Sequence, residues 1–483
     1  MVVPCAQSFS FSGNRRGTGG KQPGRARRPL RCVGTKLVPS SPSLDMNRTS
    51  VIRLVAALSL APLALAQNDN PAAAKDAAPP PANLVGPGPL TMSAAQAAGQ
   101  PNSQGTTFVT PGMPTLGRRV SSGQVSRFTN DFNPAFSFIV DGQAQLSEAE
   151  NGPDGADAFL RVFELGANAW VDPNAWAYFV AVAEDEGIGI EEAAVHYTGF
   201  GNKNVLRAGR FFVDFGKQMQ THVHDLRTLE RPLVLREYLG TELGGDGLQW
   251  DSWTTLGDAT VVRWSLGAFA SLIPEGEEDA DTATSPSASV VDGTKRADDF
   301  SYTARLTGFT EVGERGTLQL GTSARIVPSY ELGLDAGAIG GDLSNTVYGV
   351  DVTYGWVGET GIDSWTFGGE MLFNTGDVGA ELVGADDTNP ADYAVVDDSL
   401  TGFFAYGDYA WDRFNAVGAQ FSSAEVIGDE RSELELYYTR MFSEFHRLRF
   451  VIGASDSDVD GSGSKFAVQY TTILGAHGHG VNW

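Results

Sequence analysis

Cysteine is nearly absent from this sequence, since its 483 residues include only Cys5 and Cys32, both close to the N-terminus. The rest of the chain therefore has no disulfides and needs a hydrogen-bonded framework of its own. Basic residues are also scarce: 34 Lys and Arg stand against 59 Asp and Glu, a formal net charge of −25. Because a phosphate backbone is bound through a basic surface, we exclude nucleic acid as a partner.

No apolar run is long enough for a bundle of membrane-spanning helices, which excludes that architecture. The same absence leaves room for a transmembrane β-barrel, whose strands alternate apolar and polar residues. The abundant residues fit strands and turns: 58 glycines, 27 phenylalanines, 13 tyrosines and 9 tryptophans, with only 19% charged residues. Composition therefore favours an all-β protein.

The N-terminal region is divided into segments of different composition. Residues 1–45 are basic and contain both cysteines. From Met46 to residue 66 the sequence has the three parts of a secretory signal peptide: arginines, the apolar core 54–63 and the cleavage motif 64–66. Because a signal peptide acts from the N-terminus, we expect translation to start at Met46 and residues 1–45 to be upstream sequence. An unusually long basic region before the apolar core is the alternative.

Residues 67–130 are rich in Ala and Pro. Such a segment cannot bury enough apolar surface to order itself, and we predict a disordered periplasmic tail. Residues 131–483 then form the folded domain.

From residue 134 onward, apolar and polar residues alternate with a period of two. In 317–327, for example, Leu318 and Leu320 alternate with Gln319 and Gly321. A soluble β-sandwich shows the same alternation, so the length of the segments distinguishes the two folds. The segments run to 11–15 residues, whereas soluble strands average about 5–6 and membrane-spanning strands need roughly 9–11. Length therefore favours the membrane.

Sixteen such segments are separated by short and long links in a regular order. When the segments are numbered along the chain, the links that follow even-numbered segments are short. The long links all follow odd-numbered segments and are 216–246, 274–299, 330–344 and 376–399. Short turns at one end and long loops at the other are typical of a bacterial outer-membrane barrel. We predict an all-β, sixteen-stranded antiparallel transmembrane β-barrel with strands at 134–146, 158–170, 175–185, 188–199, 204–215, 247–256, 259–273, 300–312, 316–329, 345–357, 364–375, 400–411, 414–426, 431–443, 447–457 and 464–475.

Three stretches resemble the phosphate-selective porin (O/P) family: NPAFSFIVDGQAQL at 133–146, LRAGRFFVDFGKQ at 206–218 and GDGLQW at 245–250. HVHD at 222–225 with the nearby RPL, and QYTTILGAHGHG at 469–480, resemble a branch labelled zinc-regulated outer-membrane receptors. The resemblance implies a porin of the bacterial outer membrane, often a homotrimer, that passes small anions such as phosphate by diffusion. It also implies that the third loop, 216–246, folds into the bore and narrows it.

Basic residues in that loop and along the strands are the candidates for ion selectivity. Rings of Arg and Lys in a narrow polar pore favour anions. Pairing of these side chains with bore carboxylates would instead give weak selectivity, and cation preference is a third alternative. The acidic outer loops, including EGEEDAD at 275–281, oppose phosphate specificity. The candidate selectivity residues are Lys217, Arg227, Arg231, Arg236, Arg210, Arg263, Arg305 and Arg325.

Two His-x-His pairs, His222 with His224 and His477 with His479, are candidate metal ligands. Imidazole suits Zn²⁺, but the two pairs lie at opposite ends of the predicted topology and each supplies only two ligands. A metal-regulated or metal-binding outer-membrane receptor or transport protein is therefore the alternative function.

The other functional classes lack the segments that they need. A TonB-coupled receptor requires a plug domain, for which the low-complexity stretch before the barrel is too short. No motif supports a Ser, His and carboxylate hydrolase, so we expect no enzyme activity and no cofactor. The expected partners are outer-membrane lipids, small anionic or polar solutes and further copies of the chain.

Overall fold

The computed structural model describes residues 135–475 except 151–153, 185–186, 202, 273–285, 290–294, 335 and 444. The predicted upstream sequence, signal peptide and tail lie outside the described residues, as do His477 and His479. None of the described helices is long and apolar enough to cross a membrane.

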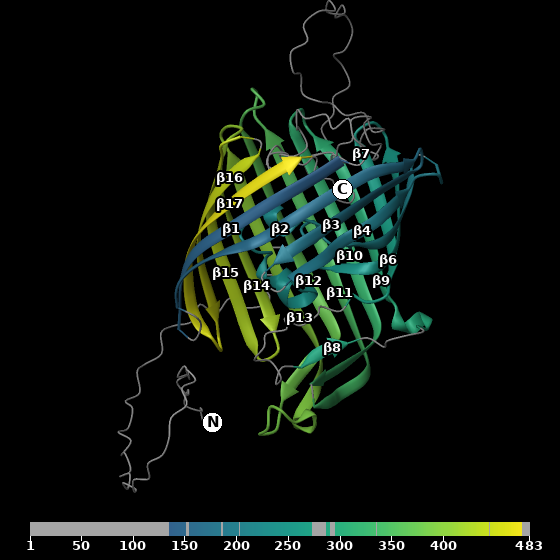
Figure 1. Ribbon diagram of the computed structural model, residues 1–483, viewed down its shortest axis with the longest axis vertical. Coiled ribbons are helices and arrows are strands. Elements are labelled where there is room, and N and C mark those ends of the chain that lie inside the picture. The colour runs from purple at the N-terminus through teal and green to yellow at the C-terminus, as the bar shows by residue number, and fades with distance from the viewer. Residues whose placement is uncertain are drawn as a thin grey trace, which may run out of the picture. The chain divides into compact units, whose positions relative to one another are not determined.

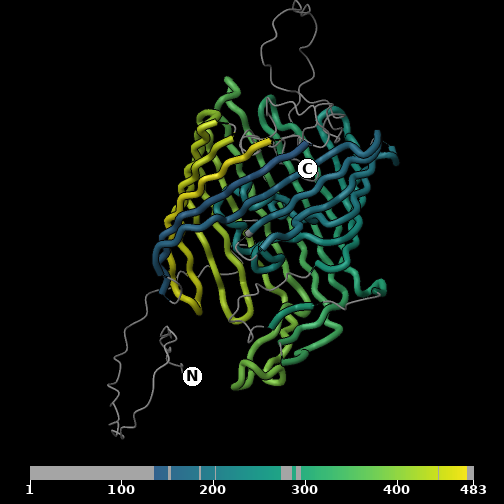
Figure 2. The backbone as a smooth tube through the Cα atoms, viewed as in Figure 1, coloured from purple at the N-terminus to yellow at the C-terminus, as the bar shows by residue number. Residues whose placement is uncertain are grey.

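The described chain forms a closed antiparallel β-barrel of sixteen strands, as the alternating segments predicted. Each strand pairs with its neighbours in sequence, and β17 pairs with β1 from Ser137↔Gly475 to Ala149↔Gly463, which closes the wall. Figure 1 and Figure 2 show the yellow β17 beside the blue β1. The strands are β1 (Ala135–Ala149), β2 (Gly155–Asp172), β3 (Ala175–Glu184), β4 (Gly187–Tyr197), β5 (Asn204–Phe212), β6 (Gly244–Leu256), β7 (Thr260–Phe269), β9 (Ser301–Val312), β10 (Gly316–Leu334), β11 (Gly337–Val357), β12 (Ser364–Leu382), β13 (Tyr393–Ala410), β14 (Asn415–Val426), β15 (Asp429–Met441), β16 (His446–Ser457) and β17 (Gly461–Gly475), with a three-residue β8 (Ser287–Ser289) attached to β10.

Alternation along each strand gives the wall two faces of opposite character. On β17, Gln469 and Thr471 are each 1% exposed, whereas Phe466 and Tyr470 are 41% and 45% exposed. Successive strand residues point to opposite sides, so the polar residues share one face and the apolar residues the other. In a closed barrel an apolar outer face suits lipid, and the ladder satisfies every backbone group without water. The outer surface is therefore that of a membrane-spanning barrel.

The ends of β10 to β13 extend further than predicted. The expected link 330–344 is mostly strand, because β10 runs to Leu334 and β11 begins at Gly337. The extra residues are held by their own apolar cluster, in which Tyr330, Leu332 and Leu343 are buried. This ribbon extension, defined as β8 with residues 330–343 and 377–398, projects beyond the wall at the end of the barrel where β8 lies (Figure 1). The prediction was limited to membrane-spanning length and missed this pairing.

The link between β5 and β6 is different, because it folds into helical turns. This β5–β6 segment, residues 213–243, contains the 3-10 turn η3 (Val223–Asp225) and the helix α4 (Leu233–Leu239). Pro232 precedes α4 with φ −49°, a value that its ring imposes and that suits a helix start. Gly240 then ends the helix with φ 84°, where a side chain would be strained.

Candidate functional site

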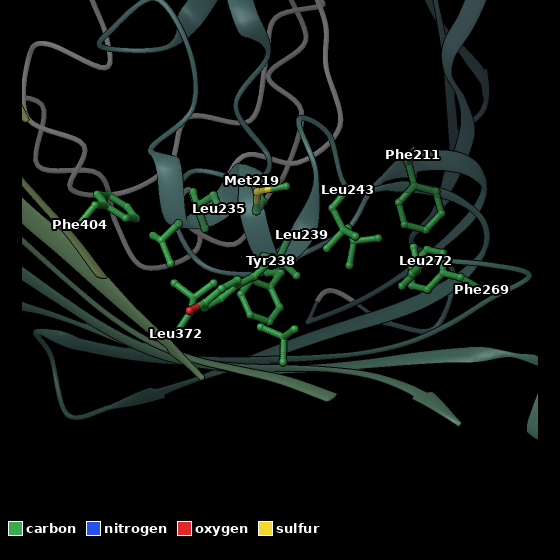
Figure 3. Close-up of a cluster of buried hydrophobic side chains, with 14 of the residues drawn as sticks. Phe211, Met219, Leu235, Tyr238, Leu239, Leu243, Phe269, Leu272, Leu372 and Phe404 are labelled. Atoms are coloured by element: carbon green, nitrogen blue, oxygen red, sulfur yellow. The ribbon is translucent and has the colours of Figure 1, made fainter. Parts of the chain in front are cut away.

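Apolar side chains of the β5–β6 segment anchor it to strands far along the chain. Val234, Leu235 and Leu239 have no exposed surface and belong to the main buried cluster, together with Leu372 of β12 and Phe404 of β13. Figure 3 shows α4 side chains turned toward these strands. At about 1.5–3 kcal/mol for each fully buried side chain of this size, the apolar contacts fix the position of the segment.

Two of its predicted selectivity residues bond to carboxylates of those strands. Arg227 donates through Nε to Asp408 of β13 at 2.8 Å, and its guanidinium lies 4.0 Å from the centre of the Tyr406 ring. Arg236 donates through Nη2 to Glu433 of β15 at 2.7 Å. With 14% and 25% of their side chains exposed, both arginines keep limited access to solvent.

Lys217 binds on another part of the wall. Its backbone N–H donates to Glu370 of β12 at 2.5 Å, and its ammonium donates to Gln319 of β10 at 3.0 Å. Burial, and next the cationic charge of Arg305, lower the pKa of Lys217 to about 7. Its charge therefore changes close to neutral pH.

Arg231 has a different environment from the other three basic residues of the segment. Its side chain is almost fully buried, and its guanidinium donates to the backbone carbonyl groups of Gln218, Thr221 and Thr241, all within the segment. Burial lowers the pKa of Arg231. Arg231 therefore links parts of the segment to one another and stabilises its internal fold.

The predicted strand arginines fall into two groups. Arg263, Arg305 and Arg325 are buried on the polar face of the wall. Arg263 contacts Asp214 at 2.6 Å and Asp251 at 2.5 Å, and Arg305 contacts Asp351 at 3.0 Å. Arg325 donates to the carbonyl oxygen of Leu272 at 3.2 Å and to Asn345. The charges of Arg263 and Arg305 are therefore paired with carboxylates, whereas Arg325 is held by uncharged oxygen acceptors.

Arg210 lies elsewhere. Its side chain is 49% exposed and pairs with Asp246 at 2.9 Å, on the same face as the exposed Leu248 and Trp250. This placement differs from the sequence prediction, and the period of two along β5 explains it. The prediction missed Arg207, which lies on the buried face three positions earlier and contacts Asp251 at 3.2 Å. Val205 is buried, and counting buried positions along β5 in steps of two from Val205 identifies Arg207.

The predicted metal ligands His222 and His224 are buried at η3, where they meet the wall. His224 Nδ1 lies 3.0 Å from Glu164 of β2, and His222 Nδ1 lies 3.2 Å from Glu191 of β4. The pKa of His222 is raised above its ordinary value. Burial by itself would lower this pKa, but the negative charges of Glu191 and Glu164 have the larger combined effect. Sequence analysis missed both glutamates, because each lies on a strand distant in sequence from the histidines.

Neither the family models nor the curated proteins include a match to this chain. Solved structures with a similar barrel include an anion-selective porin from Comamonas acidovorans, at 11% identity and TM-score 0.46, covering 71% of this chain and 99% of that one. OprB from Pseudomonas putida matches at 10% identity and TM-score 0.44, over 71% and 94% of the two chains. The channel DcaP of Acinetobacter baumannii matches at 12% and 0.42, over 71% and 96%. At these identities and scores the matches carry no functional argument.

The location of the protein follows from its own surface. A closed barrel with a lipid-facing apolar surface and polar residues on its inner face has the architecture of a bacterial outer-membrane protein. This agrees with the location predicted from the strand pattern.

Proposed function

We propose that this protein is a passive porin, through which small hydrophilic solutes cross the outer membrane by diffusion. The observation that carries the proposal is the pair of opposite strand faces in a barrel of sixteen strands. Barrels of this size leave a water-filled bore, and a polar inner face keeps that bore wet. The resemblance to phosphate-selective porins supports the same function.

The β5–β6 segment is the proposed constriction, equivalent to the inward-folded third loop of such porins. Support comes from its contacts: it joins β5 to β6, yet it bonds to Asp408 on β13 and Glu433 on β15. Arg449 of β16 also donates to the carbonyl oxygen of Thr228 at 2.8 Å. Asp408 and Arg449 are buried on the polar face of the wall. These contacts with strands distant from β5 and β6 support a segment that crosses the bore.

For ion selectivity we propose a modest anion preference, set by Lys217, Arg227 and Arg236. Most arginines near the segment pair with carboxylates, as Arg263 does with Asp214 and Asp251. Paired charges largely cancel at a distance, which favours weak selectivity over phosphate specificity. Phosphate would then be one of several anions that pass.

Reversal potentials in planar bilayers under a KCl gradient test this proposal. We expect open channels and a reversal potential of the sign given by excess chloride permeability. Absence of conductance from protein that migrates as a folded barrel would contradict the porin function. A potential of the opposite sign would contradict the anion preference alone.

Assembly and processing are separate proposals. We propose a homotrimer, to be tested by light scattering in detergent. We also propose export through a signal peptide at residues 46–66, so N-terminal sequencing of the envelope protein should begin near Gln67. The alternative function, a metal-binding outer-membrane receptor, has one supporting observation in the grouping of His222 and His224 with Glu164.

A further inference from the structure

Two histidines and two glutamates meet where the β5–β6 segment contacts β2 and β4. His224 lies in η3 and His222 directly precedes it, whereas Glu164 comes from β2 and Glu191 from β4. Ligand atoms of Glu164, His222 and His224 all lie within 4.8 Å of one another, and the three residues are buried. Glu191 Oε2 lies 3.2 Å from His222 Nδ1, at the edge of this group of three.

The spacing of these atoms suits one shared cation. Metal–ligand distances of about 2.0–2.1 Å in a tetrahedral site place neighbouring ligand atoms about 3.3 Å apart. Here His224 Nδ1 lies 3.0 Å and His222 Nδ1 lies 3.9 Å from Glu164 Oε2. The first distance is about 0.3 Å shorter and the second about 0.6 Å longer than the tetrahedral value, so binding requires small side-chain movements.

The opposite ring nitrogens also have the environment of metal-binding histidines. Such histidines direct their second ring nitrogen toward a carboxylate or carbonyl group, which fixes the tautomer. His222 Nε2 lies 3.3 Å from Glu192 Oε2, and His224 Nε2 lies 3.7 Å from Asp225 Oδ2. Glu192 is itself held by the Tyr178 hydroxyl at 3.1 Å and the Phe212 N–H at 2.9 Å. With Nε2 protonated, Nδ1 of each ring presents its lone pair to Glu164 and Glu191.

Charge favours the same conclusion. The carboxylates of Glu164, Glu191, Glu192 and Asp225 surround the two imidazoles, so acidic groups outnumber the histidines in this cluster. Concentrated negative charge at buried positions is costly unless cations compensate it. A divalent ion supplies compensation at the point where the ligand atoms converge.

We propose that Glu164, His222 and His224 bind one divalent transition-metal ion of the zinc class, with Glu191 at the edge of the site as the candidate for a fourth ligand. Mixed imidazole and carboxylate ligands suit Zn²⁺ and its first-row neighbours, whereas Mg²⁺ and Ca²⁺ take oxygen ligands. The ion would join the β5–β6 segment to β2 and β4, in addition to its Asp408 and Glu433 contacts with β13 and β15. This inference does not depend on which solutes cross the barrel.

The competing arrangement is a set of imidazolium–carboxylate ion pairs without metal. To distinguish the two, full-length protein is folded in detergent with chelator present, dialysed and titrated with Zn²⁺ alone, and bound zinc is measured by mass spectrometry. We expect one zinc per chain in the wild type. Titration with Co²⁺ should give the visible absorption band of a tetrahedral site.

Variants locate the site. We expect Glu164→Gln and the double variant His222→Ala/His224→Ala to lose the bound ion, and Glu192→Gln to bind about tenfold more weakly. The controls His446→Ala and His477→Ala/His479→Ala should keep wild-type binding. Heat-modifiable gel migration shows which variants form the barrel, and Glu164→Gln serves if the double variant does not. Absence of zinc from the wild type, or equal binding by Glu164→Gln and wild type, would overturn the proposal.

Discussion

The β5–β6 segment and the ribbon extension are both long excursions between wall strands, but they are held in different ways. The segment is fixed by contacts with strands distant in sequence: Arg227 bonds to Asp408, and Val234 N–H donates to Ser422 Oγ at 3.2 Å. The extension is fixed mainly by pairing within its own strands, as in Leu332↔Gly340 and Leu382↔Tyr393. Long loops of similar sequence length can therefore play different structural roles.

Their charges differ in the same way. The arginines of the segment are partly or fully buried, where electrostatic interactions are strong and poorly screened. Acidic residues of the extension such as Asp387, Asp397 and Asp398 are exposed, where salt screens them. We therefore expect changes in the segment to alter ion passage and equivalent changes in the extension to leave it nearly unaltered.

The largest difference should come from a charge placed in each apolar cluster. Leu235→Asp puts a carboxylate at a position with no exposed surface. Such burial costs about 4 kcal/mol or more unless the segment leaves the wall. We expect the segment to detach, single-channel conductance to rise and the current to become noisier, as measured in planar bilayers.

Leu332→Asp is the matched change in the extension, where the side chain is 5% exposed. It should loosen the ribbon while conductance stays at the wild-type value. A similar rise in conductance from both variants would remove the distinction between the two regions.

A smaller effect, on ion selectivity, should follow from removing the charges of the two partly exposed arginines of the segment. Arg227→Gln with Arg236→Gln should shift the permeability ratio toward cations by about threefold, or roughly 0.7 kcal/mol at 1.4 kcal/mol per decade. The change introduces no new carboxylate, but it leaves Asp408 and Glu433 without their guanidinium partners, which adds to the shift toward cations. Arg231 is left unchanged because its bonds to backbone carbonyl groups hold the segment together.

The matched control is Lys295→Gln with Arg296→Gln, in the link before β9. Arg296 is 82% exposed, so its field is screened within about 8 Å at physiological salt. Reversal potentials should stay at the wild-type value. An equal shift from both pairs would show that the segment does not set selectivity.

The pH dependence of selectivity should be centred on Lys217. Its pKa of about 7 means that the ammonium is charged below pH 7 and neutral above it. Anion preference should therefore fall as pH rises from about 6 to 8. The charged and titratable groups around it are Asp214, Arg227, Arg305, Asp351 and Glu370.

Lys217→Met should give the high-pH reversal potential at every pH, and Lys295→Met should keep the titration. Unchanged titration in Lys217→Met would assign the pH dependence to another group.

Much of the wall could be predicted from the sequence because a strand facing lipid on one side and water on the other must alternate. The strand predicted at 414–426 is observed as β14, Asn415–Val426, and the strand predicted at 447–457 is observed as β16, His446–Ser457. The ends of β10 and β11 could not be predicted, because Tyr330, Leu332 and Leu343 become strand residues only through their mutual packing.

The candidate site was less accessible to sequence reasoning. Loop composition identifies Arg227, Arg231 and Arg236 as one basic group, but only the fold separates the internal role of Arg231 from the wall contacts of the other two. In the same way, HxH spacing identifies His222 and His224, whereas Glu164 and Glu191 join them through tertiary contacts. Roles that depend on such distant pairs are not encoded in local pattern.

The smallest effect should come from the exposed acids of the ribbon extension. Asp387→Asn, Asp397→Asn and Asp398→Asn together remove negative charge from a surface that anions approach. The Debye length is about 30 Å at 0.01 M salt and 3 Å at 1 M. Chloride conductance should therefore rise slightly at 0.01 M and not at 1 M. The Arg227→Gln/Arg236→Gln variant is the counterpart, because its charges are partly buried and its selectivity shift should persist in high salt. If the triple variant still altered conductance at 1 M, the extension would act at short range on the permeating ions, and its separation from the ion path would be wrong.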